Sequence, residues 1–411
     1  MAKYNNIERK LIKLFDCCPG LRAGIKFVYQ YICYFLNKKN YQYKLYPGLK
    51  LQKDSDKRSF WGYYDKSPER EGKILYHRFK TTGSTALVDI MLDNEKISES
   101  KTWNWQQGAM TTWLDDENII HNDFDGDKYI SKIVNIKTKN AKIVDFPVYA
   151  VSKDGKFALS LNFSRLARLR PDYGYFNRDF AHIPRYDEND GIYKIDPEKN
   201  RSDLIVSFRD LAGFKPVKSM EDAWHKVNHI DIASDNKRFI FLHRWFATNG
   251  KKYSRLITAD TDGKNLYCLA GDEMVSHACW KDNNKIVCRA EKENLGEKYF
   301  LFTDRTEDFE IIGEGILTED GHPSVNGKWL LTDTYPDKSR MSRILLFDME
   351  NSELIEIGEF FCPIEYYGQI RCDLHPRWGL DRNSITFDAV FEGERSIYKI
   401  DLTGILKERQ R

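Results

Sequence analysis

A short pattern, a tight turn followed by a β-type run, recurs seven times along this chain and restricts what it can fold into. Each turn contains Asn, Asp or Gly, usually with Lys, and the run that follows is rich in apolar residues. Asn-Gly and Asp-Gly supply the positive φ that a two-residue hairpin demands, so the pattern predicts strand, turn, strand. The seven turns begin at Glu71, Asp116, Asp154, Asp235, Asn283, Asn326 and Arg382.

The spacing of these turns predicts the fold. Successive turns lie roughly 40–55 residues apart, except for one gap of about 80 residues that holds a long loop, 165–191. This period is typical of four-stranded propeller blades, and seven turns predict seven blades. We therefore expect an all-β fold, a seven-bladed β-propeller over residues 47–411, preceded by a short helical basic extension over residues 1–46. An irregular β-sandwich is the alternative, but it would not require even spacing.

Charge and cysteine usage exclude several classes of protein. The 411 residues carry 64 Lys and Arg against 62 Asp and Glu, so the net charge of +2 implies no nucleic-acid partner. The eight cysteines form no CxxC pair, and the opening MAKYNNIERK is not a signal peptide, so we expect a cytoplasmic protein. No apolar run approaches the ~20 residues that a membrane-spanning helix needs.

Residues 1–46 differ in charge from the rest of the chain. They hold nine Lys and Arg against two Asp and Glu, a net charge of +7. Residues 21–36 are rich in aromatic side chains and are followed by Lys38 and Lys39. Two interpretations stay open: a helix that holds the protein on the anionic inner face of the cell membrane, or a helix that packs across the main domain.

Four of the seven turns are preceded by a histidine at almost the same offset. His229, His277 and His375 each lie 7 residues before a residue of their turn, and His322 lies 5 before. A fixed place in successive blades puts residues at equivalent positions around the axis, and a difference of two residues preserves side-chain direction. We therefore expect the four rings to meet near one mouth of the channel, as a metal site requires. The alternative is four separate structural histidines.

The later blades resemble those of a known family. Residues 322–333 (HPSVNGKWLLTD) and 369–402 are similar to blades of oligogalacturonate lyases, and the likeness covers roughly residues 220–402. Those proteins are cytoplasmic seven-bladed propellers that cleave uronate oligosaccharides by β-elimination. The resemblance implies a divalent metal, usually manganese, and a histidine general base assisted by an arginine. On this sequence it implies His229 as the base and Arg244 as the arginine.

The metal-binding motif of that family is altered in this chain. The family motif is Gln-x-x-His-x-His-Pro, whereas residues 369–376 read Gln-Ile-Arg-Cys-Asp-Leu-His-Pro. Asp373 replaces the middle histidine, and Gln369 is one residue too distant. Aspartate is a hard oxygen donor that can ligate manganese or magnesium, so the coordination sphere is changed. The metal ligands that we expect are His277, His322, Gln369, Asp373 and His375.

The front of the chain has a second resemblance. Residues 58–69 (RSFWGYYDKSPE) and 166–175 (LARLRPDYGY), together with the basic N-terminal segment, are similar to propeller proteins encoded with bacterial capsule and O-antigen genes. Those proteins are often labelled glycosyltransferases. The resemblance implies sugar transfer or modification on a lipid-linked glycan.

Several aromatic and polar side chains suit a sugar ligand. Aromatic faces stack on the C–H faces of sugar rings, and arginines pair with carboxylates or phosphates. Packing between blades and solvated surface charge are the alternatives for the same residues. The substrate-binding residues that we expect are Trp61, Tyr64, Asp65, Arg168, Arg170, Trp224 and His225.

Three functions stay open at this point. We favour a carbohydrate-active propeller of bacterial surface-polysaccharide biosynthesis, with glycosyltransferase-type transfer or modification of a lipid-linked oligosaccharide or polysaccharide. A metal-dependent uronate lyase is the alternative. A non-catalytic glycan-binding scaffold is the third.

Overall fold

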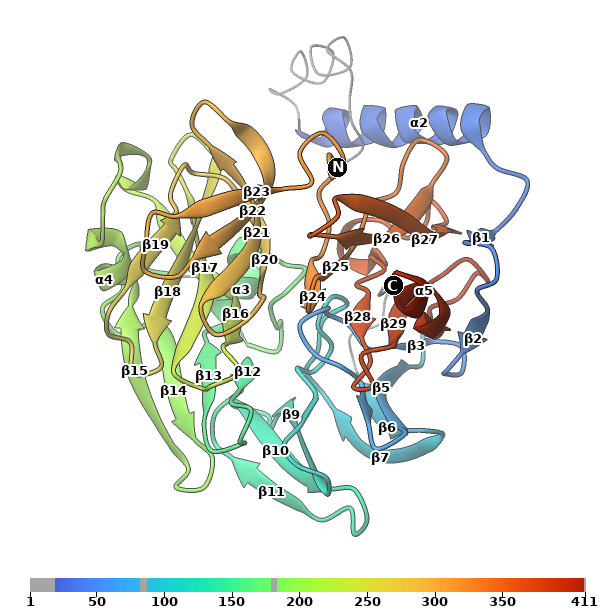
Figure 1. Ribbon diagram of the computed structural model, residues 1–411. Helices are drawn as coiled ribbons and strands as arrows, with labels where there is room; N and C mark the ends of the chain where they lie inside the picture. Colours follow the sequence, from blue (N-terminus) through green and yellow to red (C-terminus); the bar gives the residue numbers. More distant parts are fainter. Residues whose placement is uncertain (1–18, 82–86, 179–182, 410–411) are drawn as a thin grey trace.

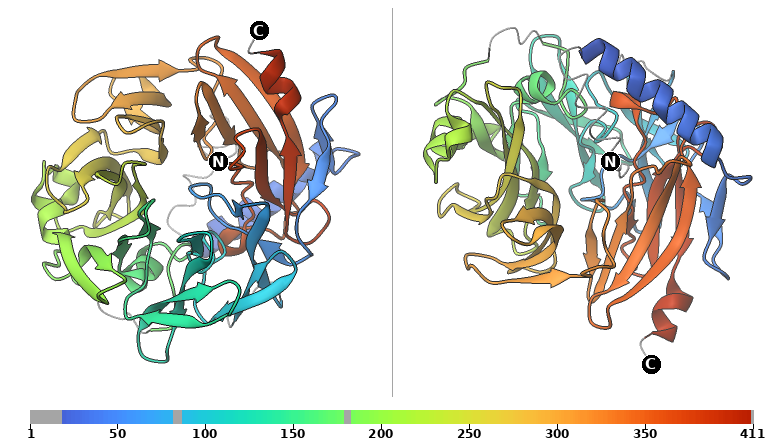
Figure 2. Two further views of the ribbon diagram at one scale, coloured as in Figure 1. Left: turned by 60° about the horizontal axis from the view of Figure 1, so that its bottom comes forward. Right: turned by 90° about the horizontal axis from the view of Figure 1, so that it is seen from above.

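The computed structural model describes residues 19–81, 87–178 and 183–409. Within these residues the strands form seven separate antiparallel sheets around a central axis, which Figures 1 and 2 show from three directions. The seven-bladed β-propeller predicted from the repeats is confirmed. Six of the predicted turns join the two innermost strands of a blade, and the turn at Glu71 joins the short strand Glu69–Arg70 to Lys73–Phe79 in the first blade. Residues 1–18 of the predicted basic segment lie outside the described residues.

The blades follow one another in chain order, and each runs from the axis outward. The first blade contains β3 (Ser59–Phe60), β5 (Lys73–Phe79), β6 (Val88–Leu92) and β7 (Glu95–Ser100), and β4 (Glu69–Arg70) also pairs with β5. The second blade contains β8 (Thr112–Trp113), β9 (Asn118–Phe124), β10 (Tyr129–Asn135) and β11 (Ala141–Val144), and the third contains β12 (Ala150–Val151), β13 (Ala158–Leu161), β14 (Gly191–Asp196) and β15 (Arg201–Ser207). The fourth blade contains β16 (Trp224–Ile232), β17 (Arg238–Phe246), β18 (Lys252–Asp260) and β19 (Tyr267–Ala270). The last three are β20 (Val275–Trp280), β21 (Lys285–Lys292), β22 (Gly296–Thr303) and β23 (Phe309–Ile312); β24 (Ser324–Asn326), β25 (Trp329–Asp333), β26 (Met341–Asp348) and β27 (Glu353–Phe361); and β28 (Arg377–Trp378), β29 (Ser384–Ala389) and β30 (Ser396–Asp401).

The middle strands of the blades are buried on both faces, because each blade packs between two others. Such strands read as continuous apolar runs rather than as an alternation of apolar and polar residues. The run RFIFLH that begins β17 is buried throughout, and β26 (MSRILLFD) is buried at all but one position. The apolar core therefore lies between the blades and holds the inner strands rigidly around the axis.

N-terminal strands close the ring. β2 (Leu51–Lys53) pairs with β30 and completes the last blade, while β1 (Tyr43–Leu45) pairs with β27 and adds a fifth strand to the blade before it. Helix α2 (Pro19–Asn37) lies along the rim of that blade (Figure 1), and the ring of Tyr34 stacks on Phe361 with centroids 5.6 Å apart. In the described parts of the chain, no helix is long and apolar enough to cross a membrane.

The remaining helices are short. The predicted long loop between β13 and β14 begins with α3 (Phe163–Leu169), which is capped by the side chain of Asn162. Helix α4 (Phe208–Gly213) starts in a capping box made by Ser207 and Asp210, and α5 (Thr403–Glu408) follows the last strand. Two short 3-10 helices, η1 (Lys218–Met220) and η2 (Gly368–Ile370), precede inner strands.

Candidate functional site

The four histidines of the repeat lie side by side at the axis. The ring centroids are 5.5 Å apart for His229 and His277, 4.2 Å for His277 and His322, and 4.2 Å for His322 and His375. All four side chains are buried. Four consecutive blades thus each deliver one imidazole to the same part of the channel.

Irregular backbone turns these side chains toward the axis. The pairing of β16 with β17 shifts register between Asn228 and Asp231, around His229, and the pairing of β20 with β21 shifts around His277. His229 and His375 have positive φ values of 53° and 45°, an uncommon conformation for residues other than glycine. Bulges of this kind re-aim side chains next to functional sites. The backbone therefore supports a functional interpretation of the cluster.

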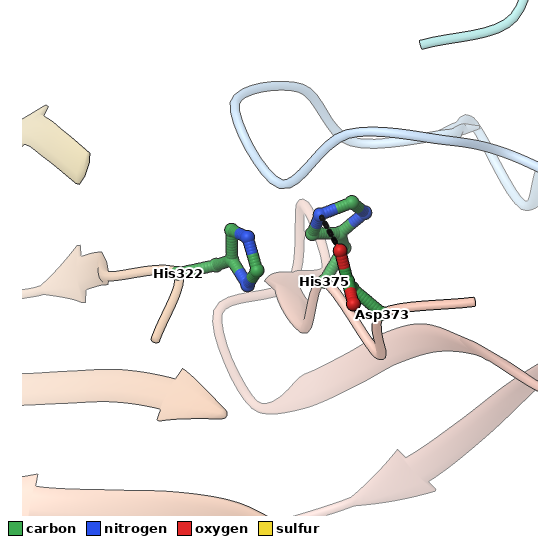
Figure 3. Close-up of side chains that lie close together, drawn as sticks. All are labelled: His322, Asp373 and His375. Carbon is green, nitrogen blue, oxygen red and sulfur yellow. Dashed lines mark ion pairs between the residues drawn. The ribbon is translucent and has the colours of Figure 1, made fainter. Parts of the chain in front are cut away.

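Three side chains of this cluster form a donor set for a metal ion. His322, Asp373 and His375 each offer one ligand atom, and these atoms all lie within 4.8 Å of one another (Figure 3). His375 Nδ1 donates to the carbonyl oxygen of Gly62 at 2.7 Å, and His322 Nδ1 donates to Asp333 Oδ1 at 2.8 Å. The Nε2 atoms of both rings are buried and have no hydrogen-bond partner among the described residues.

This arrangement fits a divalent cation. A metal-binding histidine commonly donates its other ring N–H to a carboxylate or carbonyl group, which fixes the tautomer and directs the free lone pair at the metal. His322 and His375 both follow that pattern, and Asp373 Oδ2 lies 3.9 Å from His375 Nε2. Imidazole and carboxylate ligands together suit manganese, zinc or iron. These three residues are therefore the ones that could hold the ion.

Electrostatics around the donor set keep Asp373 ionised. Burial opposes its charged form, but Arg371, whose Nε lies 2.8 Å from Asp373 Oδ2, together with His322 and Arg395 outweighs burial and lowers the pKa of Asp373. Burial and the neighbouring His322 hold the pKa of His375 well below its usual value. Burial also opposes the charged form of His322, but the carboxylates of Asp333, Asp373 and Asp320 together outweigh burial and raise the pKa of that ring.

A tyrosine pairs with His229 on the other side of the cluster. Tyr63 Oη lies 2.6 Å from His229 Nδ1, and the two rings stack with centroids 5.1 Å apart. Burial raises the pKa of Tyr63 well above its usual value, so the phenol keeps its proton. Burial, together with the charge of Arg244, holds the pKa of His229 well below 6.5. His229 is therefore a neutral imidazole at pH 7, as a general base must be.

The loop that carries Tyr63 and Tyr64 is fixed by a buried carboxylate. Asp388 accepts hydrogen bonds from the backbone nitrogens of Trp61 and Gly62, both at 3.2 Å. Arg377 Nη2 binds Asp388 Oδ1 at 2.6 Å. Because β29 holds Asp388, the last blade positions a loop from the first blade inside the channel.

Several cations gather beside His229, and the nearby carboxylate of Asp172 pairs with one of them, Arg170, at 3.4 Å. Lys226 is buried, and its ammonium lies 5.6 Å from the centroid of the Phe246 ring, while that of Lys252 lies 5.2 Å from it. Burial lowers the pKa values of Lys226 and Arg244. The positive charge of Arg244 lowers the pKa of Lys226 further, and that of Arg170 lowers the pKa of Arg244 further. Mutual repulsion of this kind favours an anionic ligand, because a negative charge would relieve it.

The structure separates some expected ligands from the donor set. Gln369 is exposed on η2, and its backbone oxygen accepts a bond from Gln106. His277 packs against His322, but its Nδ1 faces Ser276 Oγ at 3.0 Å and Asp320 Oδ1 at 3.5 Å. Burial lowers the pKa of His277 to about 4. Three of the five expected ligands, His322, Asp373 and His375, therefore have donor atoms that converge, and the Gln369 side chain is exposed away from them. His277 has the same Nδ1–carboxylate contact as His322 and stays a predicted ligand.

Two expected sugar-binding residues are internal. Trp61 is buried in an apolar cluster, and its indole nitrogen donates to the carbonyl oxygen of Lys66. His225 is buried, with Nδ1 bonded to His243 Nε2 at 2.8 Å. Both side chains are buried. Their binding of substrate stays a prediction. Their aromatic and polar character serves packing between strands and a buried hydrogen bond.

The other expected substrate-binding residues are spread over both mouths of the channel. Arg170 is half-buried with its guanidinium 5.3 Å from the centroid of the Tyr173 ring, whereas Arg168 is exposed on α3. Trp224 is half-buried under the guanidinium of Arg185. Tyr64 packs against His322 with ring centroids 5.4 Å apart.

The opposite mouth, on the side of the inner turns, contains Asp65. Two adjoining cavities of about 270 and 230 Å³ lie there, and Asp65, Lys153 and Asp231 line both. Burial raises the pKa of Asp231 to about 6. Asp65 is therefore well placed for a ligand at this mouth, away from the three-residue donor set.

Sequence reasoning did not single out Asp333 or Lys226 as functional. Asp333 ends the run WLLTD that follows His322, and Asp388 ends the corresponding run SITFD in the next blade. A carboxylate at the same place in two neighbouring blades was the available signal for Asp333.

Comparisons with known proteins show which solved structures share this fold. No protein-family model and no curated protein matches this sequence. An oligogalacturonate lyase from Vibrio parahaemolyticus has a similar structure, with a TM-score of 0.60 at 13% identity, over 87% of this chain and 96% of that one. A structure titled as an oligogalacturonate lyase in complex with manganese gives 0.58 at 14% identity, over 88% and 98%. The chain therefore has the seven-bladed propeller fold of these lyases.

Proposed function

We propose that this protein is a metal-dependent lyase that cleaves an acidic, uronate-type oligosaccharide by β-elimination. The observation that carries the proposal is the donor set of His322, Asp373 and His375 beside the His229–Tyr63 pair. Two buried Nε2 atoms of this set have no hydrogen-bond partner in the part of the chain that the structure describes. The manganese-bound lyase of similar fold supports the choice of metal.

Each group of the site has a task in this reaction. His322 and His375 would hold the ion through Nε2, and Asp373 through a carboxylate oxygen. When bound, the ion acts as a Lewis acid that stabilises negative charge on the substrate carboxylate. His229 takes the proton from the carbon next to that carboxylate at Nε2, in the tautomer whose Nδ1–H donates to Tyr63 Oη. The electron pair forms the new double bond, the bond to the leaving sugar oxygen breaks, and that oxygen takes a proton from solvent.

The cations beside His229 support an acidic substrate. Arg244 and Lys226 are positioned next to the base, and Arg170 and Lys252 lie within electrostatic reach of them. A chain of uronates offers one carboxylate per sugar, so neighbouring sugars can each meet a cation. Arginine in particular binds carboxylates through paired hydrogen bonds.

The other functions predicted from the sequence have weaker support. Sugar transfer to a lipid-linked glycan of the bacterial surface has no geometric feature in the described residues that favours it over elimination. A scaffold without catalysis leaves the partnerless imidazole nitrogens and the His229–Tyr63 pair without a role. Membrane association through residues 1–46 is compatible with each of these functions, and the outward face of α2 supports it.

Ultraviolet absorbance of an unsaturated product tests the proposal. The purified protein is incubated with oligouronates and Mn²⁺, with a chelator in the parallel reaction. We expect absorbance to rise only with the metal, His375→Ala to lose both metal binding and activity, and His229→Ala to lose activity but keep the metal. Release of nucleoside diphosphate from a nucleotide sugar, without unsaturated product, would favour transfer. Glycan binding without turnover would favour the scaffold.

A pair of neighbouring lysines provides a matched test of the substrate's charge. Lys252 and Lys251 are both exposed, but only Lys252 lies over Phe246 near the cations of the site. We expect Lys252→Ala to raise KM for an oligouronate about tenfold, and Lys251→Ala to leave it unchanged. Equal KM values for the two variants would remove the acidic substrate from the proposal.

A further inference from the structure

Helix α2 presents an apolar stripe to the outside of the molecule. Its half-buried side packs on the propeller through Tyr34, whose ring stacks on Phe361. The opposite side shows large apolar residues three and four positions apart, which places them on one face of the helix. Phe35 is 64% exposed and Leu36 74%. The exposed members of the stripe are Val28, Tyr31, Ile32, Phe35 and Leu36.

The stripe lies in a basic part of the chain. Lys38 and Lys39 follow the helix and are exposed, and the ammonium of Lys38 lies 5.4 Å from the centroid of the Phe35 ring. Residues 1–46 carry nine Lys and Arg against two Asp and Glu. Apolar side chains bordered by positive charge are the composition of a helix that lies in the interface of an anionic membrane.

The helix sits at the same end of the propeller as the donor set. Phe361, which α2 contacts, pairs with Met341 at the start of β26, and Asp333 pairs with Ile344 three residues further along that strand. Asp333 in turn accepts hydrogen bonds from His322. The end of β27 that touches α2 therefore faces the same way as the mouth that holds the candidate metal site. Figure 1 shows α2 above β26 and β27.

We propose that the outward face of α2 inserts into an anionic lipid bilayer and brings the mouth of the candidate site toward the membrane surface. The positive charge of residues 1–46 complements anionic headgroups, and Phe35 and Leu36 supply the apolar contact. The saccharide that enters this mouth is then one that is held at the membrane. The binding step does not depend on the lyase chemistry, because it needs no substrate.

Co-sedimentation of the full-length chain with vesicles tests this proposal. We expect binding to vesicles that contain phosphatidylglycerol and much weaker binding to pure phosphatidylcholine vesicles. Leu36→Asp should weaken binding to the anionic vesicles at least about tenfold, because a charge replaces an apolar side chain that inserts into the bilayer. Leu380→Asp is the matched control: Leu380 is 61% exposed in the turn before β29 and should leave binding unchanged.

Depth-dependent quenching adds a second measurement. A tryptophan placed by Phe35→Trp should be quenched by brominated acyl chains in anionic vesicles, and Leu380→Trp should not, each judged against the parent chain. Equal vesicle binding by Leu36→Asp and the parent protein would overturn the proposal. So would a dimer in sedimentation velocity that Leu36→Asp dissociates while the parent shows no vesicle binding, because a second copy of the chain would then cover the stripe.

Discussion

Replacing Asp333 by asparagine tests whether this carboxylate supports metal binding as well as the stability of the fold. Asp333 is buried and accepts bonds from the His322 backbone nitrogen at 2.9 Å, from His322 Nδ1 at 2.8 Å and from the His375 backbone nitrogen at 3.0 Å. Asparagine keeps one acceptor oxygen but turns an NH₂ group toward the N–H of His375. One charge-assisted bond is lost and the others are weakened, so we expect the free energy of unfolding to fall by about 3 kcal/mol.

The same substitution should also weaken metal binding. Asp333 fixes the tautomer of His322, and loss of such a supporting partner typically costs about 10–100-fold in metal affinity. Titration calorimetry with Mn²⁺ measures this, and urea unfolding in a chelator measures stability. Asp348→Asn is the control, since Asp348 is equally buried at the far end of the same blade, where it pairs with Lys328 at 2.7 Å. A folded Asp333→Asn variant with unchanged Mn²⁺ affinity would refute the reasoning.

Three further predictions concern the centre of the channel. Asp388→Ala leaves Arg377 and Arg395 buried without their counter-charge, so we expect urea unfolding to show a loss of about 3–5 kcal/mol; a loss under about 1 kcal/mol would contradict this. Because the pKa of His229 lies well below 6.5, the ring stays neutral as the pH falls through 6.5, and the kcat/KM profile of elimination should show no inflection there; an acid limb centred at 6.5 would contradict it. Tyr63→Phe removes the hydroxyl beside His229, and we expect kcat to fall about 10²-fold with KM unchanged; an unchanged kcat would exclude a role for that hydroxyl.

The blade count could be predicted because its signal is local. The residues of a turn such as Asn326-Gly327-Lys328 determine its conformation locally, and the seven turns recur at similar intervals apart from the one wide gap after Asp154. The convergence of the histidines follows from the same repeat, since equal offsets in neighbouring blades mean equal heights along the axis. Local turn chemistry and the blade repeat therefore predict the fold and the height of the imidazole rings along the axis.

The partners of those rings could not be predicted, because they come from distant parts of the chain. Tyr63 meets a histidine 166 positions away, and its loop is held by Asp388, which is more than 320 positions from it. No pattern within either segment indicates the other. The position of Trp61 could not be predicted either. It stands two residues from Tyr63, yet its side chain packs in the apolar core between blades. Sequence spacing alone did not distinguish a side chain at the axis from one in the core.

The interpretation of the N-terminal segment left two alternatives open, a helix that packs on the domain and a helix at a membrane. The described part of α2 does pack on the propeller through Tyr34, and it also leaves Phe35 and Leu36 exposed. The two alternatives are therefore compatible, because they concern opposite sides of one helix. The amphipathic pattern could not reveal this, since both sides of the helix contain apolar and aromatic residues.

The most direct test of the central claim is anomalous diffraction from crystals grown with Mn²⁺. The account predicts one strong anomalous peak bonded to His322 Nε2, His375 Nε2 and a carboxylate oxygen of Asp373, absent from crystals of His375→Ala. Full manganese saturation in solution with no peak between these three side chains, or a peak on other residues, would contradict the assignment of this cluster as the metal centre.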